Sequence, residues 1–89
     1  MDPTANQLSQ ETKALVQQGS WRDACGAAQR WARSCPDEPQ AYYWFAFSAL
    51  RLGQPADAEA ALRNGLERAP GHHILMSLLA STLIARGNN

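Results

Sequence analysis

Residues 42–70, YYWFAFSALRLGQPADAEAALRNGLERAP, contain the most complete copy of a pattern that recurs along this chain of 89 residues. A shift of 34 positions in either direction brings residues of the same type into register. The matched sets are Gly19, Gly53 and Gly87; Asp23 and Asp57; Ala24 and Ala58; Ala27 and Ala61; Pro36 and Pro70; and Ala46 and Ala80. A fixed period of this length is typical of repeat architectures, in which each repeat is one supersecondary unit.

Apolar residues inside each repeat follow helical spacing, and no stretch alternates like a strand. The clearest runs are Tyr42, Phe45, Ala46 and Ala49, and then Met76, Leu79, Ala80 and Leu83. Gly19 and Gly53 suit left-handed turns at helix ends, and Pro55 suits the first position of a helix. We therefore predict an all-α fold with helices near residues 4–18, 21–34, 39–52, 55–68 and 72–86.

Small residues recur where neighbouring helices would approach each other closely. They are Ala24, Ala28, Ala46, Ala58 and Ala80. Bulkier side chains at these positions would separate the helices, because interaxial distances depend on the side chains at the contact. We expect all five alanines to lie in helix contacts.

This pattern resembles the tetratricopeptide repeat, a 34-residue helix-turn-helix unit. The second unit fits best, with Tyr42, Phe45, Ala46, Ala49, Gly53, Ala58, Leu62 and Pro70 at signature positions. In the first unit, Glu11 and Thr12 stand where an apolar and a small residue are usual. The resemblance implies a right-handed α-solenoid of antiparallel helix pairs with five helices. It also implies a single domain over residues 1–89, with repeats at about 5–38 and 39–72 and a half repeat or capping helix at about 73–87.

Charge and composition argue against several classes of function. Eight basic and eight acidic residues leave no net charge to attract nucleic acid or an anionic membrane surface. The most apolar segment, 74–85, is shorter than the roughly 20 residues needed to span a bilayer. The first ten residues lack the features of a secretory signal peptide, so we expect a cytoplasmic protein without membrane insertion.

No group of residues has a spacing that indicates catalysis, so we expect no enzyme and no cofactor. Cys25 and Cys35 lie ten positions apart, about 15 Å along a helix, whereas a disulfide needs Cα atoms within about 7 Å. Adjacent His72 and His73 point in different directions on a helix and are expected at a helix start. We therefore expect no metal site.

The resemblance implies that the first helix of each pair lines a concave groove that binds a peptide or helix of a partner protein. The expected partner-binding residues are Lys13, Gln17, Gln40, Tyr43, Trp44, Phe47, Arg51, Ser77, Leu78 and Ser81. Tyr43, Trp44 and Phe47 form an aromatic stripe that suits either a binding surface or the core between stacked helices. Only Lys13 matches the basic cluster by which some family members hold a chaperone's terminal carboxylate.

The last helix, 72–86, is apolar over most of its circumference, whereas a terminal capping helix should have a polar outer face. Two explanations stay open: the chain is part of a longer array, or two copies form a homodimer through this end. The candidate self-association residues are Ile74, Leu75, Leu78 and Ile84.

A protein-protein interaction module is the function that this reading favours, and the identity of the partner is left open. One alternative is a small chaperone or adaptor for a secreted or aggregation-prone client. Another is an assembly segment of a larger multidomain enzyme. All three rest on the resemblance, since a fold does not by itself determine a function.

Overall fold

The computed structural model describes residues 5–87 and shows five α-helices with no strand in that range. The helices are α1 (Ala5–Gln17), α2 (Trp21–Ser34), α3 (Pro39–Arg51), α4 (Pro55–Arg68) and α5 (His73–Gly87). The predicted all-α class and the five helices are confirmed. The expected start of the first helix at residue 4 lies outside the described residues, and every other boundary falls within one position of its prediction.

Left-handed glycines end α1 and α3, as the sequence predicted. Gly19 and Gly53 both have φ of 75°, a conformation that costs a residue with a Cβ atom. The amide of Gln54 then donates to the carbonyl of Ala49 at 2.9 Å, and an equivalent bond closes the turn after α1. These bonds satisfy carbonyls that the helix leaves free, so each turn reverses the chain within three residues.

Different caps start α3 and α5. The Glu38 carboxylate accepts a hydrogen bond from the amide of Gln40 at 3.2 Å, and Pro39 occupies the first helical position. The ring nitrogen Nδ1 of His72 accepts from the amide of Leu75 at 3.4 Å. The predicted location of the histidine pair at a helix start is confirmed.

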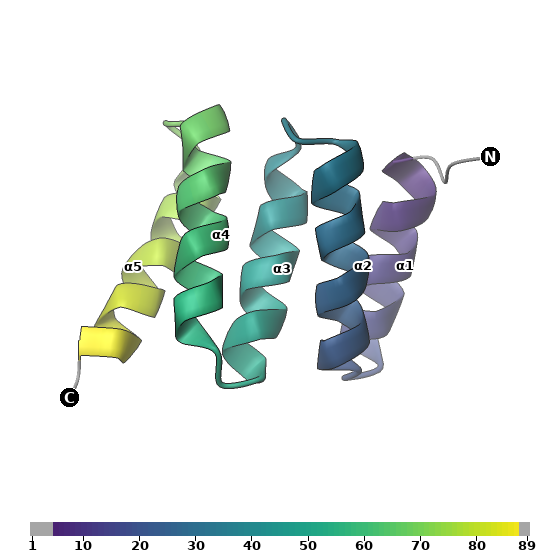
Figure 1. The fold of residues 1–89 in the computed structure, drawn as a ribbon, viewed down its shortest axis with the longest axis horizontal. Helices are drawn as coiled ribbons and strands as arrows, with labels where there is room; N and C mark the ends of the chain where they lie inside the picture. Colours follow the sequence, from purple (N-terminus) through teal and green to yellow (C-terminus); the bar gives the residue numbers. More distant parts are fainter. Residues whose placement is uncertain (1–4, 88–89) are drawn as a thin grey trace.

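Figure 1 shows consecutive helices running in opposite directions, with α2 and α4 in front and α1, α3 and α5 behind. Helix α3 contacts each of the other four helices, whereas α2 and α4 do not approach each other closely. The Cα atoms extend over 45 × 28 × 16 Å, so the molecule is about two helices thick. One broad side is therefore formed by α1, α3 and α5, and the other by α2 and α4.

The core consists of two clusters that share α3. The larger cluster joins α3, α4 and α5 through Ala46, Ala49, Ala58, Ala61, Leu62 and Leu75. The smaller cluster joins α1, α2 and α3 through Leu8, Trp31 and Ala41. At Gly65 an added Cβ atom would lie 2.9 Å from the Cβ of Tyr42, so α4 approaches α3 too closely there for any larger residue.

Two positions depart from the repeat pattern, and at the second of them an expectation is corrected. Thr12 is fully buried, and its hydroxyl is satisfied by donating to the Leu8 carbonyl at 2.8 Å. Ala80, expected in a helix contact, is exposed. The other four alanines of that set are buried, so Ala80 differs in what lies next to it and not in residue type.

Helix α5 is the most apolar of the five, with 15 residues. It buries Leu75 and Thr82 but exposes Ile74, Met76, Leu83 and Ile84. No helix within residues 5–87 has both the length and the apolar character needed to cross a membrane. The exposed side of α5 is the main departure from a helix with one apolar face.

Candidate functional site

An aromatic cluster lies on the side of the molecule formed by α1, α3 and α5. The ring centroid of Tyr43 lies 4.9 Å from that of Trp44 and 6.1 Å from that of Phe47. Trp44 and Phe47 meet edge to face at 5.9 Å. These distances are typical of rings in favourable contact.

The cluster is both core and surface. Tyr43 packs against the larger core cluster and Trp44 against the smaller one, but both side chains, like that of Phe47, keep part of their surface exposed. The alternative left open by the sequence is thus not exclusive. Truncating these rings would remove core packing as well as any binding surface.

Arg51 and Trp21 extend the cluster toward the turns at one edge of the molecule. The guanidinium carbon of Arg51 lies 5.3 Å from the ring centroid of Phe47 and 5.5 Å from that of Trp21. Trp21 in turn lies 5.7 Å from Phe47. Arg51 is exposed and lies over these two rings, without a carboxylate partner among residues 5–87.

Two hollows flank Tyr43. The α1–α3 hollow, about 380 Å³ in volume, is lined by Lys13, Gln40, Tyr43, Trp44, His72 and Ile74. The α3–α5 hollow, about 320 Å³, is lined by Tyr43, His73, Ile74, Ser77, Leu78 and Ser81. Because Tyr43 and Ile74 line both, the two hollows adjoin and form one groove across three helices, here called the Tyr43 groove.

Most of the expected partner-binding residues line this groove. Gln17 is exposed and lines neither hollow, and Phe47 and Arg51 belong to the adjoining aromatic cluster. Among the candidate self-association residues, Ile74 and Leu78 line the groove and Ile84 is exposed. Leu75 has no exposed surface, so it belongs to the core and not to a contact between molecules.

Sequence reasoning missed Trp21, His72 and His73 as neighbours of the groove. All three lie at or next to the start of a helix. The repeat period does contain a signal for Trp21. Trp21 follows Gly19 by two positions and Arg51 precedes Gly53 by two. Equivalent turns lie side by side in a repeat protein, so Trp21 and Arg51 are expected to be neighbours.

Among the residues that line the Tyr43 groove, Lys13 is the one Lys or Arg. Neither hollow is lined by a carboxylate, and Lys13 makes no ion pair within the described part of the chain. The acidic partners of other cations lie elsewhere: Glu11 pairs with Arg30, and Asp37 pairs with Arg68. An anionic group on a ligand would therefore meet Lys13 without competition from the protein.

No protein-family profile, curated protein or solved structure matches this chain.

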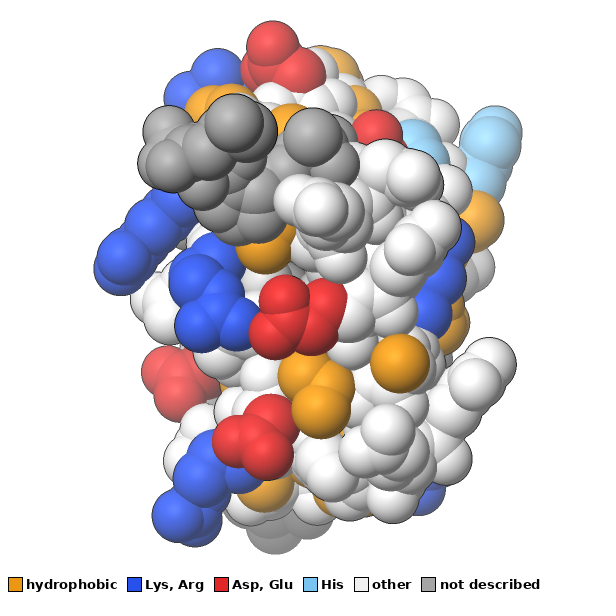
Figure 2. Space-filling view, turned by 90° about the vertical axis from the view of Figure 1, so that its right-hand side faces the viewer, with side chains coloured by type: hydrophobic (Ala, Val, Ile, Leu, Met, Phe, Trp, Pro, Cys, Tyr) orange, Lys and Arg blue, Asp and Glu red, His pale blue; other side chains and the backbone are white. Residues whose placement is uncertain are grey.

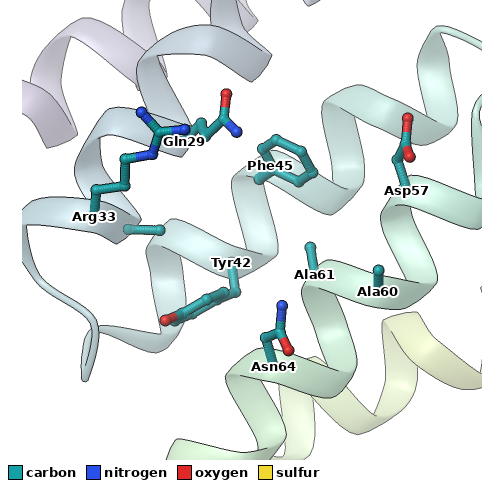
Figure 3. A pocket seen from close by; sticks show the side chains of 9 residues that line it. Gln29, Arg33, Tyr42, Phe45, Asp57, Ala60, Ala61 and Asn64 are labelled. Carbon is teal, nitrogen blue, oxygen red and sulfur yellow. The ribbon is translucent and has the colours of Figure 1, made fainter.

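A third hollow, on the other broad side, lies between α2 and α4 with α3 at its base (Figure 3). Its volume is about 350 Å³. Tyr42 and Phe45 rise from α3, while Arg33 from α2 and Asp57 from α4 stand at opposite walls (Figure 3). The Tyr42 hydroxyl donates to the Pro36 carbonyl at 2.8 Å and is thus already satisfied. In the sequence, Tyr42 and Phe45 belong to the regular apolar spacing of a helix, which gives no sign of a hollow above them.

Neither cysteine is in a disulfide, and the surroundings of Cys25 disfavour its reactive form. Cys25 and Cys35 are free and partly buried. Burial, with a smaller contribution from the Asp57 carboxylate, raises the pKa of the Cys25 thiol above its ordinary value. A raised pKa disfavours the thiolate, the form that acts as nucleophile and metal ligand. Residues 5–87 contain no cluster of three or more His, Cys, Asp or Glu side chains suited to a metal ion.

Proposed function

We propose that this chain is a protein-protein interaction module of the tetratricopeptide type, a right-handed α-solenoid of two and a half repeats. It binds an extended or helical segment of a partner protein in the Tyr43 groove, and it has no catalytic role. The observation that carries the proposal is the meeting of two hollows at Tyr43 and Ile74, with walls supplied by three helices. The 34-residue period supports it, because the period relates α1, α3 and α5 to one another.

The chemistry of the groove defines the ligand. Tyr43, Trp44 and Ile74 offer partly exposed apolar surface beside hydroxyls of Ser77 and Ser81. Such a wall suits one or two large apolar side chains, with the serines available for backbone hydrogen bonds. Lys13 and Arg51 then favour an Asp or Glu close to those side chains. We therefore expect partner segments that combine an aromatic or aliphatic anchor with an acidic residue.

Selection from a library of random displayed peptides tests this preference directly. The expected result is enrichment of acidic residues next to large apolar ones, because Lys13 lines the groove, Arg51 lies in the adjoining cluster, and neither hollow is lined by a carboxylate. Binding of a selected peptide should weaken with added salt, since exposed charges are screened. Selection of basic peptides would contradict the proposal.

Variants of exposed residues then locate the binding surface without disturbing the core. Ile74→Glu should weaken binding of a selected peptide by about tenfold or more, equivalent to about 1.4 kcal/mol. Lys13→Glu should remove the preference for acidic residues. Arg33→Glu is the matched control, because it reverses a charge in the hollow on the opposite side. Loss of binding in Arg33→Glu with no effect of Ile74→Glu would move the site to that hollow.

A further inference from the structure

Every exposed large hydrophobic side chain within residues 5–87 belongs to α5. These residues are Ile74, Met76, Leu83 and Ile84, with exposed fractions of 57%, 49%, 42% and 65%. Ile74 already belongs to the Tyr43 groove. Met76 and Leu83, with exposed Ala80 between them, lie on another side of the helix and are here called the α5 stripe.

The register of the repeat shows what such a stripe does elsewhere in the molecule. Residues 34 positions before the α5 stripe are Tyr42, Ala46 and Ala49 of α3. These three pack in one cluster with Ala58, Ala61 and Leu62 of α4, so α4 covers that side of α3. Residues 68 positions before the stripe include Leu8, which is buried against Trp31 of α2. The α5 stripe is thus the third copy of a surface that receives a helix in the other two copies.

A second copy of this chain can supply the missing helix through its own α5 stripe. Within residues 5–87 the large apolar side chains with the largest exposed fractions are all on α5, and the partly exposed rings near the Tyr43 groove lie on another side of the molecule. Figure 2 faces the α1 and α2 end, where, outside the grey atoms, red, blue and white atoms make up most of the visible surface and orange side chains are scattered. A head-to-tail contact would bury the stripe against that polar end. Pairing the stripe of one copy with the stripe of another places apolar side chains against apolar side chains. A two-fold contact of this kind forms a closed dimer.

We propose that the α5 stripe is a two-fold interface between two copies of this chain, with the two α5 helices antiparallel and crossing at Ala80. The small side chain at the crossing permits close approach, as small residues do between helices inside each copy. Met76 and Leu83 of each copy then flank Ala80 of the other. The stripe contains no charged residue, so the symmetry brings no like charges together.

The size of the contact predicts a reversible dimer. A helix of 15 residues is about 22 Å long, so one helix pair buries less than the roughly 800 Å² per partner of a standard interface. We expect monomer and dimer to exchange at micromolar concentrations.

Sedimentation velocity over a concentration series, from low micromolar to near millimolar, provides the test. The wild-type mass should rise from the 9.7 kDa of one chain toward twice that value. Leu83→Glu should raise the dissociation constant at least about tenfold, because it places two carboxylates in an apolar contact. Ile74→Glu is the matched control, since it adds the same charge to a more exposed apolar position of α5 outside the stripe. Circular dichroism checks that both variants keep the wild-type helix content.

A cysteine variant tests whether the two α5 helices cross at Ala80. In a background with Cys25→Ser and Cys35→Ser, Ala80→Cys should form a disulfide between copies under mild oxidation, because the two-fold axis passes beside it. A cysteine at exposed Ala56 of α4 should not crosslink. A chain that stays monomeric over the whole series would overturn the proposal and leave the stripe to a helix of another protein. Dimerisation lost in Ile74→Glu but kept in Leu83→Glu would also overturn it.

Discussion

Helices α1 and α5 occupy equivalent places in the repeat, 68 residues apart, yet side chains at matched positions are buried in α1 and exposed in α5. Leu8 and Thr12 of α1 are fully buried, whereas their counterparts Met76 and Ala80 in α5 are exposed. The reason is not residue type, because methionine and alanine suit a core at least as well as threonine. Helix α2 lies against α1, and within the described residues nothing lies against that side of α5.

A second matched pair of positions is charged and exposed in α1 but apolar and partly buried in α5. Glu11 of α1 is exposed and pairs with Arg30 of α2 at 3.0 Å. The position of Glu11 corresponds to partly buried Leu79 in α5, which packs against the larger core cluster. Helix α1 therefore resembles the end of an array with a solvated side, whereas α5 retains the apolar character of an interior helix.

The largest expected difference between the two helices is in the cost of truncating a matched side chain. Leu8→Ala should lower the free energy of unfolding by about 2–5 kcal/mol, because it leaves a cavity in the smaller core cluster. Met76→Ala, at the equivalent exposed position, should cost less than about 0.5 kcal/mol at concentrations where the chain is monomeric. Urea unfolding of both variants measures the difference. Equal costs would show that α5 is covered even in the monomer.

A smaller difference in stability is expected between alanine substitutions of Gly19 and Gly87, because of these two only Gly19 has a positive φ. Gly19→Ala should cost about 1–2 kcal/mol, because φ of 75° strains a residue with a Cβ atom. Gly87, the third glycine of the period, lies at the end of α5 and has no positive φ. Gly87→Ala should be neutral or slightly stabilising, since alanine favours the helix. A cost at Gly87 similar to that at Gly19 would mean that α5 ends in the same turn in solution.

The fold could be predicted because its signals are local. Gly19, Gly53 and Pro55 define turns through backbone chemistry, and the 3.6-residue spacing of apolar side chains identifies the helices. Exposure could not be predicted in the same way, as Leu75 and Ala80 show. Spacing tells which residues share a face of a helix, but whether a neighbour covers that face depends on the tertiary arrangement.

Some residues of the candidate site could likewise be predicted from the sequence, and others could not. Residues such as Lys13, Tyr43 and Ser81 could be assigned to one side because the period relates their helices. His72 and His73 could not, because they approach the groove from a helix start whose position depends on the path of the connection before it. The opposite hollow between α2 and α4 was also missed, since Tyr42 and Phe45 carry the same apolar pattern whether or not a gap lies above them.

The smallest expected effect concerns Glu59, the α4 carboxylate that pairs with α5. Arg86 of α5 and Arg63 both pair with Glu59 of α4. Hydrogen bonds from Arg63 and Arg86 lower the pKa of Glu59 below its ordinary value of 4.5. A carboxyl with a lowered pKa in the folded state stabilises the fold above its ordinary pKa. This contribution is lost as the pH falls through the lowered pKa.

Glu59→Gln should therefore reduce stability slightly at neutral pH and have less effect below pH 4.5, where the wild type loses the same contribution. Protection of α5 amides from hydrogen exchange, compared at neutral and acidic pH, measures whether the loss is local to α5. Glu67→Gln on the same helix is the control, because Glu67 makes no ion pair within residues 5–87. A pH-independent effect of Glu59→Gln would assign the role of this residue to packing, and α5 would then be held to α4 by Leu75, Leu78 and Leu79 alone.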